Sequence, residues 1–126
     1  MKRIYLCHKK ELRPYKTRQF DVEVDAQHRL NLFLLNQDGT IRAYLNYCPH
    51  LGIQLNWQPN EFLSLEQTHI ICAVHGALFE LENGLCSSGP CRGDKLTALP
   101  IEIADDGSIY FIPTADMSLP PNAGLQ

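Results

Sequence analysis

Short apolar stretches separated by turn residues run along most of this chain, and none has a helical period of useful length. Residues 17–24 alternate and place Phe20, Val22 and Val24 on one face, as expected for a strand with one buried side. Eight further segments read as strands: 4–7, 30–35, 41–46, 69–73, 77–81, 85–87, 99–104 and 108–112. The pattern therefore predicts an all-β fold.

Three turn signals join neighbouring strands. Asp38-Gly39 lies between the segments 30–35 and 41–46, and Asn83-Gly84 follows the segment 77–81. Asp105, Asp106 and Gly107 connect the last two segments. Such pairs favour the tight turns of β-hairpins, so we expect three hairpins at these positions.

Length and composition indicate one globular domain. The chain has 126 residues, of which 44% are hydrophobic and 20% charged, enough to bury a single core. We expect the domain to span residues 1–113 and residues 114–126 to form a loose tail, because the end of the chain is rich in proline and small residues. The net charge is −3 without a basic run, which argues against a role in nucleic-acid binding.

No segment is suited to cross a membrane. The N-terminus is basic but no apolar stretch follows it, and the longest apolar run covers only residues 32–35. A secretory signal or a membrane span needs a much longer run. We therefore expect a cytoplasmic protein with no membrane contact.

Two short pairs of metal-binding residues stand out. Cys48-Pro49-His50 and Cys72-Ala73-Val74-His75 each offer a thiolate followed by an imidazole. Two cysteines can hold one iron of a binuclear cluster while two histidines hold the other. A structural zinc site also uses two cysteines and two histidines, and that alternative stays open. However, zinc fingers usually place both cysteines in one half, whereas here each half carries one of each.

The pattern resembles the Rieske [2Fe–2S] family. The surrounding residues add to the resemblance: Asn46, Cys48, Pro49, His50, Gly52 and Leu55, then Cys72, His75, Gly76 and Phe79, and a third segment, 84–93, similar to the Gly-Pro loop that shields the cluster in that family. The interval between His50 and Cys72 is 21 residues, a few more than usual, and we expect the additional residues in 56–67 to form a surface loop.

The resemblance implies both a fold and a ligand set. It implies stacked antiparallel sheets, with a small cluster-binding subdomain at about residues 47–92, and one [2Fe–2S] cluster per chain. Cys48 and Cys72 would bind the inner iron, and His50 and His75 the outer iron, near which electrons leave. No catalytic residue is expected.

Comparison with high-potential members of that family implies a low potential. Those proteins carry a disulfide between the two ligand loops, at positions that here hold Ile53 and Val74. They also place a serine and a tyrosine that donate hydrogen bonds to sulfur, where this chain has Ala77 and Phe79. Such bonds stabilise the reduced cluster and raise the potential. We therefore expect a potential of about −150 mV rather than +300 mV.

Several other residues are ambiguous. Gly52 and Gly76 either form turns with positive φ or bring backbone N–H groups close to the cluster. Cys86 and Cys91 are close enough in sequence to pair, but sequence alone leaves open whether they do. Cys7, His8, His28 and His69 lie outside the motif, and no metal role is expected for them. Leu51 and Ile53 are expected to shield the cluster from water, with ordinary core packing as the alternative, and Trp57 is expected to pack and not to conduct electrons.

The resemblance favours a monomeric one-electron carrier that accepts electrons from a reductase and delivers them to an oxygenase or another terminal enzyme. Three alternatives stay open at this point. The chain could be the small subunit of a larger reductase of the nitrite reductase type, a redox sensor whose cluster gates a protein contact, or a zinc-binding interaction module.

Overall fold

The computed structural model describes residues 3–26, 28–49, 52–56, 58–73 and 76–113. Within them the chain forms strands and one short 3₁₀ turn, in the order β1 (Ile4–His8), η1 (Lys9–Glu11), β2 (Thr17–Asp25), β3 (His28–Gln37), β4 (Thr40–Leu45), β5 (His69–Ile71), β6 (Leu78–Glu80), β7 (Cys86–Ser88), β8 (Ile101–Ile103) and β9 (Ser108–Phe111). The all-β prediction is confirmed. No helix in these ranges is long and apolar enough to cross a membrane.

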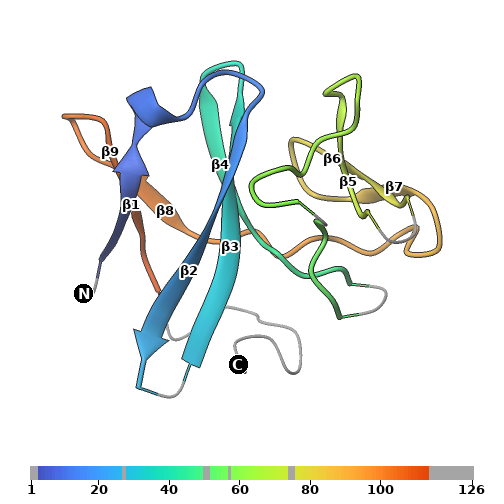
Figure 1. The fold of residues 1–126 in the computed structure, drawn as a ribbon, viewed down its shortest axis with the longest axis horizontal. Coiled ribbons are helices and arrows are strands. Elements are labelled where there is room, and N and C mark those ends of the chain that lie inside the picture. The colour runs from blue at the N-terminus through green and yellow to red at the C-terminus, as the bar shows by residue number, and fades with distance from the viewer. Residues whose placement is uncertain (1–2, 27, 50–51, 57, 74–75, 114–126) are drawn as a thin grey trace.

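The strands form three antiparallel sheets of three strands each. We call them the terminal sheet (β1-β9-β8), the central sheet (β2-β3-β4) and the ligand-loop sheet (β5-β6-β7). The central sheet stands between the other two (Figure 1). This arrangement agrees with the stacked antiparallel sheets that the family resemblance implied.

Strand β3 is buried on both faces, which explains why it carries the longest apolar run. Leu32, Phe33, Leu34 and Leu35 are all inaccessible to solvent. Because side chains alternate across a strand, Leu32 and Leu34 pack toward the terminal sheet in one core. Phe33 and Leu35 pack into a second core with the residues of the ligand-loop sheet. This second core, the ligand-side core, contains the candidate metal ligands.

The hairpin turns form where the sequence predicts them. Asp38 and Gly39 adopt φ values of 50° and 98°, which fits a turn with both central residues in the left-handed region. Thr40 pairs with Gln37 across that turn. The predicted turns at Asn83-Gly84 and Asp106-Gly107 also connect antiparallel strands, β6 to β7 and β8 to β9.

Several predicted strands are shorter in the structure. Strand β8 covers Ile101–Ile103 in place of residues 99–104, and β5 and β6 lack the ends that the second ligand loop replaces. Strand β5 ends at Ile71 and not at residue 73, and β6 begins at Leu78 and not at residue 77. Between them the N–H of Cys72 donates to the carbonyl of Ala77 at 2.9 Å. The backbone around Cys72 thus closes a loop and does not continue the ladder.

The loop at residues 56–67 is more firmly attached than its polar composition suggested. Most of its described residues are exposed, and the Leu65 side chain is 99% exposed. Phe62, however, is fully buried and stacks on Phe33 with ring centroids 4.0 Å apart. The carbonyl of Phe62 also accepts the N–H of Ile71 at 2.9 Å. One buried aromatic residue therefore anchors a loop expected to lie entirely on the surface.

Candidate metal centre

The two ligand loops close with the same pair of backbone hydrogen bonds. In the first loop, Cys48 N–H donates to the carbonyl of Ile53 at 2.7 Å, and Gly52 N–H donates to the carbonyl of Cys48 at 2.7 Å. In the second, Cys72 N–H donates to Ala77 at 2.9 Å and Gly76 N–H donates to Cys72 at 2.8 Å. The backbone therefore presents Cys48 and Cys72 in equivalent positions.

Both loops need a glycine four residues after the cysteine. Gly52 and Gly76 have φ values of 71° and 70°, a region that residues with a side chain rarely adopt. The turn interpretation of these glycines is thus confirmed. Their N–H groups bind the cysteine carbonyls at the same time, which fixes the start of each loop relative to its end.

The candidate ligand thiols are buried together. Cys48 is 1% exposed and Cys72 is fully buried, and both belong to the ligand-side core. A hydrogen bond of 2.8 Å from Ala73 N–H to the carbonyl of Leu55 ties one loop to the other. His50 and His75 lie outside the described residues, as do Leu51, Trp57 and Val74, so the expected roles of these residues stay predictions.

The surroundings of the two thiols fit one end of an iron–sulfur cluster. The core around them is lined by Leu55, Phe62, Ile70 and Phe79, and a thiolate in such apolar surroundings needs a compensating positive charge. Iron supplies that charge and deprotonates a coordinating thiol. Among the described residues, His, Cys, Asp and Glu side chains form no group of three or more that could hold a metal ion. The two histidines predicted to complete the ligand set, His50 and His75, lie outside the residues searched.

A hydrogen-bonded network of asparagine side chains attaches the first ligand loop to the central sheet. Asn46, at the end of β4, is only 5% exposed. Its side-chain oxygen accepts the N–H of Leu55 at 2.8 Å, and its nitrogen donates to Asn31 at 2.8 Å and to Asn56 at 3.0 Å. Asn31 donates in turn to Asp21 at 2.9 Å. The network connects β2 and β3 of the central sheet to both ends of the loop.

Asn46 belongs to the sequence motif, but the rest of this network is not predicted from the sequence. The signal that could have found it is Asn31, a polar residue within the apolar alternation of β3. A buried polar side chain needs hydrogen-bond partners, so such a residue indicates a partner elsewhere. Nothing in the sequence identified Asn46 or Asn56 as that partner.

A third loop, formed by residues 84–93, covers the second ligand loop. At Gly89, with φ of 105°, an added Cβ would lie 2.8 Å from the Cα of Ala77. Ala77 is buried and follows His75 by two residues. Only glycine permits so close an approach, so the loop rests directly on the backbone beside the predicted ligand.

Two further cysteines belong to this third loop. Cys86 and Cys91 are each 2% exposed, and their Sγ atoms are 2.7 Å apart. Burial, with a smaller contribution from the hydrogen bond to Cys86, raises the pKa of the Cys91 thiol to about 12. Cys91 is therefore a neutral thiol at physiological pH.

Three of the four positions that distinguish high-potential members, Ala77, Phe79 and Ile53, are described by the structure. Ala77 and Phe79 lie in the ligand-side core, 1% and 0% exposed, and neither side chain can donate a hydrogen bond. Ile53 is 39% exposed, so it lies at the rim of the first ligand loop. It is therefore not an ordinary core residue, and its expected role in shielding the cluster from water stays a prediction.

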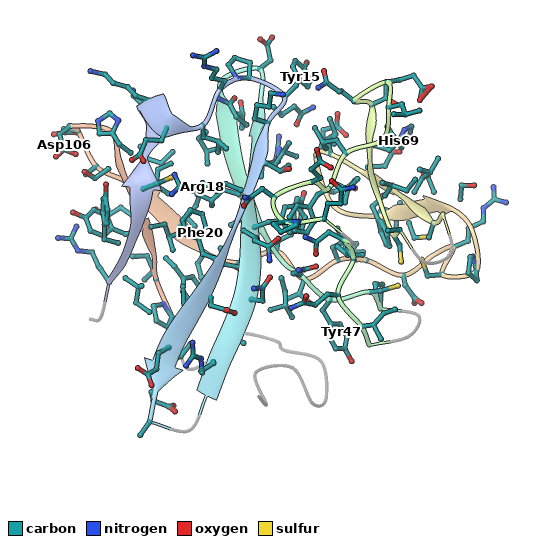
Figure 2. The ribbon with its side chains drawn as sticks, viewed as in Figure 1. Tyr15, Arg18, Phe20, Tyr47, His69 and Asp106 are labelled. Atoms are coloured by element: carbon teal, nitrogen blue, oxygen red, sulfur yellow. The ribbon has the colours of Figure 1, made fainter. Side chains whose placement is uncertain are left out.

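The off-motif histidines whose side chains are described have other partners. His8 caps η1 and contacts the carbonyl of Asp106, and His69 lies 3.1 Å from a carboxylate oxygen of Glu80. His69 also lies at the opposite end of the ligand-loop region from Tyr47, which precedes the first ligand (Figure 2). Among the described residues, neither histidine belongs to a group of three or more side chains that could hold a metal ion.

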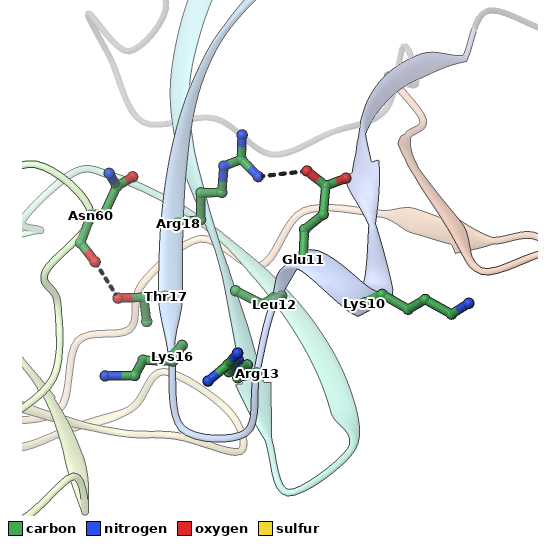
Figure 3. Close-up of a pocket in the computed structure, with 8 residues that line it drawn as sticks. All are labelled: Lys10, Glu11, Leu12, Arg13, Lys16, Thr17, Arg18 and Asn60. Atoms are coloured by element: carbon green, nitrogen blue, oxygen red, sulfur yellow. Dashed lines mark hydrogen bonds and ion pairs between the residues drawn. The ribbon is translucent and has the colours of Figure 1, made fainter.

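A polar groove of about 450 Å³ occupies a different part of the surface. It is lined by η1, the start of β2 and Asn60, and Glu11 spans it to pair with Arg18 at 3.2 Å (Figure 3). Thr17 donates there to the carbonyl of Asn60 at 2.6 Å. Of the candidate ligands, Cys48 and Cys72 are described by the structure, and neither lines this groove.

Several solved structures share the fold. The ferredoxin of carbazole 1,9a-dioxygenase from Nocardioides aromaticivorans IC177 is 18% identical with a TM-score of 0.66, covering 90% of this chain and 100% of that one. A chain of a complex of oxygenase and ferredoxin in carbazole 1,9a-dioxygenase is 22% identical with a TM-score of 0.66, covering 93% and 98%. A quaternary ammonium Rieske monooxygenase is 19% identical with a TM-score of 0.65, but this chain covers only 33% of its length.

A comparison of the sequence with protein-family models identifies the family. No curated protein sequence matches the chain significantly. The model of the Rieske [2Fe–2S] domain matches residues 2–104, which include both ligand loops and the third loop. The chain therefore belongs to the Rieske [2Fe–2S] domain family.

Proposed function

We propose that the chain is a one-electron carrier whose single [2Fe–2S] cluster is held by the thiolates of Cys48 and Cys72 and the imidazoles of His50 and His75. The observation that supports this most directly is the pair of equivalent loops that bury Cys48 and Cys72 in one core. The spacing of the two histidines completes the ligand set of the family.

When bound, the cluster would supply a redox couple that accepts and releases one electron. The residues of the chain determine how easily that happens. Two neutral imidazoles in place of thiolates lower the negative charge on the centre, so its potential lies above that of all-cysteine ferredoxins. Ala77 and Phe79 provide no hydroxyl toward sulfur, so we expect a potential near the low end of the Rieske range, at about −150 mV.

The proposed partners are a reductase and an oxygenase. Similarity to the ferredoxin of carbazole 1,9a-dioxygenase over the whole length of that ferredoxin supports this choice. We place the carrier in the cytoplasm, as a monomer comprising the domain at residues 1–113 and the tail at residues 114–126.

The test is electron transfer in a reconstituted chain. Holoprotein is added in small amounts to NADH, a flavin-dependent ferredoxin reductase and cytochrome c as an artificial acceptor. We expect the rate of cytochrome c reduction above the reductase background to rise in proportion to the cluster concentration. The variant Cys48→Ser/Cys72→Ser serves as the control without a cluster.

Two of the alternatives, the zinc module and the redox sensor, predict a different result. A zinc module would contain no acid-labile sulfide and would not raise the rate. A sensor would hold a reducible cluster but would transfer no electron to cytochrome c within the time of the assay. Either result would contradict the proposal.

A further inference from the structure

Cys86 and Cys91 have no role in the proposed ligand set, yet their thiols are in contact. Their Sγ atoms lie 2.7 Å apart, with Cys91 as donor, and the Cys86 thiol donates to the carbonyl of Ser88 at 3.4 Å. Both residues belong to the ligand-side core, whereas Cys7 lies in the other core. The five cysteines thus comprise two predicted ligands, one adjacent pair and one isolated thiol.

The backbone holds the two residues of the pair together without a covalent bond. Cys86 N–H donates to the carbonyl of Asp94 at 2.8 Å, and Asp94 N–H donates to the carbonyl of Cys91 at 2.8 Å. Gly93 N–H donates to Cys86 at 3.3 Å. Since the sulfurs of a disulfide are about 2.05 Å apart, the bond requires only a small movement of two side chains that already meet.

The pair brackets the part of the third loop that covers the second ligand loop. Between the two cysteines lies Gly89, whose backbone rests on Ala77. The carbonyl of Ala77 accepts the N–H of the predicted ligand Cys72. A covalent link between Cys86 and Cys91 would therefore fix both ends of the segment that packs beside the cluster.

We propose that Cys86 and Cys91 form a dithiol–disulfide couple that closes the third loop covalently when oxidised. In this step two S–H bonds break and one S–S bond forms, with the release of two protons and two electrons. A low-molecular-weight disulfide accepts them and is cleaved to two thiols. The step proceeds by thiol–disulfide exchange through a mixed disulfide.

The surroundings of the pair determine its rate. Exchange needs a thiolate, and both sulfurs are almost completely shielded from solvent. The third loop must open before the oxidant reaches them. The couple therefore responds to a sustained change in redox conditions, and a test must allow long equilibration.

The experiment counts free thiols in the holoprotein. Samples are equilibrated anaerobically with reduced and oxidised glutathione at a series of ratios, quenched with acid, denatured and alkylated with N-ethylmaleimide. The chain has five cysteines, so we expect five labels under reducing conditions and three under oxidising conditions. Peptide mapping should locate the link between Cys86 and Cys91.

The controls separate the pair from the ligand cysteines. A fully reduced sample taken through the same quench must give five labels, which excludes oxidation of Cys48 and Cys72 by released iron. The variant Cys7→Ser should still lose two labels on oxidation, whereas Cys86→Ser/Cys91→Ser should lose none. Five labels on the wild-type protein at every ratio, or a link that maps to other cysteines, would overturn the proposal. Electron transfer is measured separately and does not depend on this result.

Discussion

Ala77 and Phe79 are the side chains by which this protein differs most clearly from high-potential members of its family. Both lie in the core that contains Cys48 and Cys72. A hydroxyl at either position would offer a hydrogen bond to sulfur, which stabilises the more negative, reduced cluster. The absence of both hydroxyls is the physical reason for expecting a low potential.

The variant Ala77→Ser/Phe79→Tyr should therefore have a higher midpoint potential. A hydrogen bond that favours the reduced state by about 1.4 kcal/mol raises the midpoint of a one-electron couple by about 60 mV. A spectroelectrochemical titration measures the shift. Ala43→Ser/Phe20→Tyr adds the same atoms to the other core and should leave the midpoint unchanged. An unchanged midpoint in the first variant would show that the hydroxyls do not reach sulfur.

Asn46 offers a second test, which concerns stability and iron retention. Asn46→Ala removes the acceptor of the Leu55 N–H and the donor to Asn31. Each buried polar group left unpaired costs about 1–3 kcal/mol, so urea unfolding should occur at a lower concentration and the protein should retain less iron. Asn83→Ala is the control, since Asn83 accepts the N–H of Leu85 in an exposed turn. Equal losses in the two variants would contradict a supporting role for Asn46.

For individual residues, the sequence predicts features formed by neighbouring residues, but not contacts between segments that lie far apart in the chain. The ligand pairs and the turn glycines are recognisable because the residues involved are close together in the chain. The contact of Gly89 with Ala77 and the network from Asp21 to Asn56 join segments far apart in sequence. Neither periodicity nor spacing contains that information.

Among the elements, the third loop depends on the absence of a side chain at one position. Gly89 and Gly93 have similar φ values of 105° and 96°, but a Cβ at Gly93 would meet nothing within 4 Å. Gly93→Ala should therefore cost only backbone strain, about 1–3 kcal/mol. Gly89→Ala should cost more, because the new Cβ collides with Ala77.

Denaturant unfolding of the two glycine variants measures this difference directly. We also expect Gly89→Ala to lose its iron to a chelator faster than Gly93→Ala, since only the first substitution displaces the loop from the ligand region. Similar unfolding free energies in both variants would mean that the third loop moves away without cost.

The sequence predicts the hairpins of the central and terminal sheets well, because alternation and turn residues are both local signals. The sequence predicts the strands and the burial around the ligand loops less accurately. Strands β5 and β6 are shorter than their apolar patterns, because backbone groups at their ends close the ligand loops. The burial of Phe62 depends on stacking with Phe33, a residue of the central sheet that the pattern of residues 56–67 cannot indicate.

For the molecule as a whole, stability should depend on pH through carboxylates at the end opposite to the ligand loops. A hydrogen bond from the His8 N–H, assisted by Arg18, holds the pKa of Glu11 below its ordinary value of 4.5. A depressed pKa stabilises the folded state above the ordinary value, and this contribution is lost as the pH falls through the folded-state pKa.

The comparison of wild type with Glu11→Gln isolates this contribution. The difference in unfolding free energy should be largest near neutral pH and should shrink as the solution is acidified below pH 4.5. Urea titrations at a series of pH values measure it. A difference that stays constant with pH would mean that the carboxylate charge of Glu11 does not contribute.

One measurement tests the identity of the bound metal most directly. Low-temperature EPR of anaerobically purified protein should show no cluster signal before reduction. After dithionite it should show one with the low average g-value of a cluster held by both cysteine and histidine. A protein that stays EPR-silent, contains zinc and releases no acid-labile sulfide would contradict the account, and would leave a β-rich zinc-binding domain in place of an electron carrier.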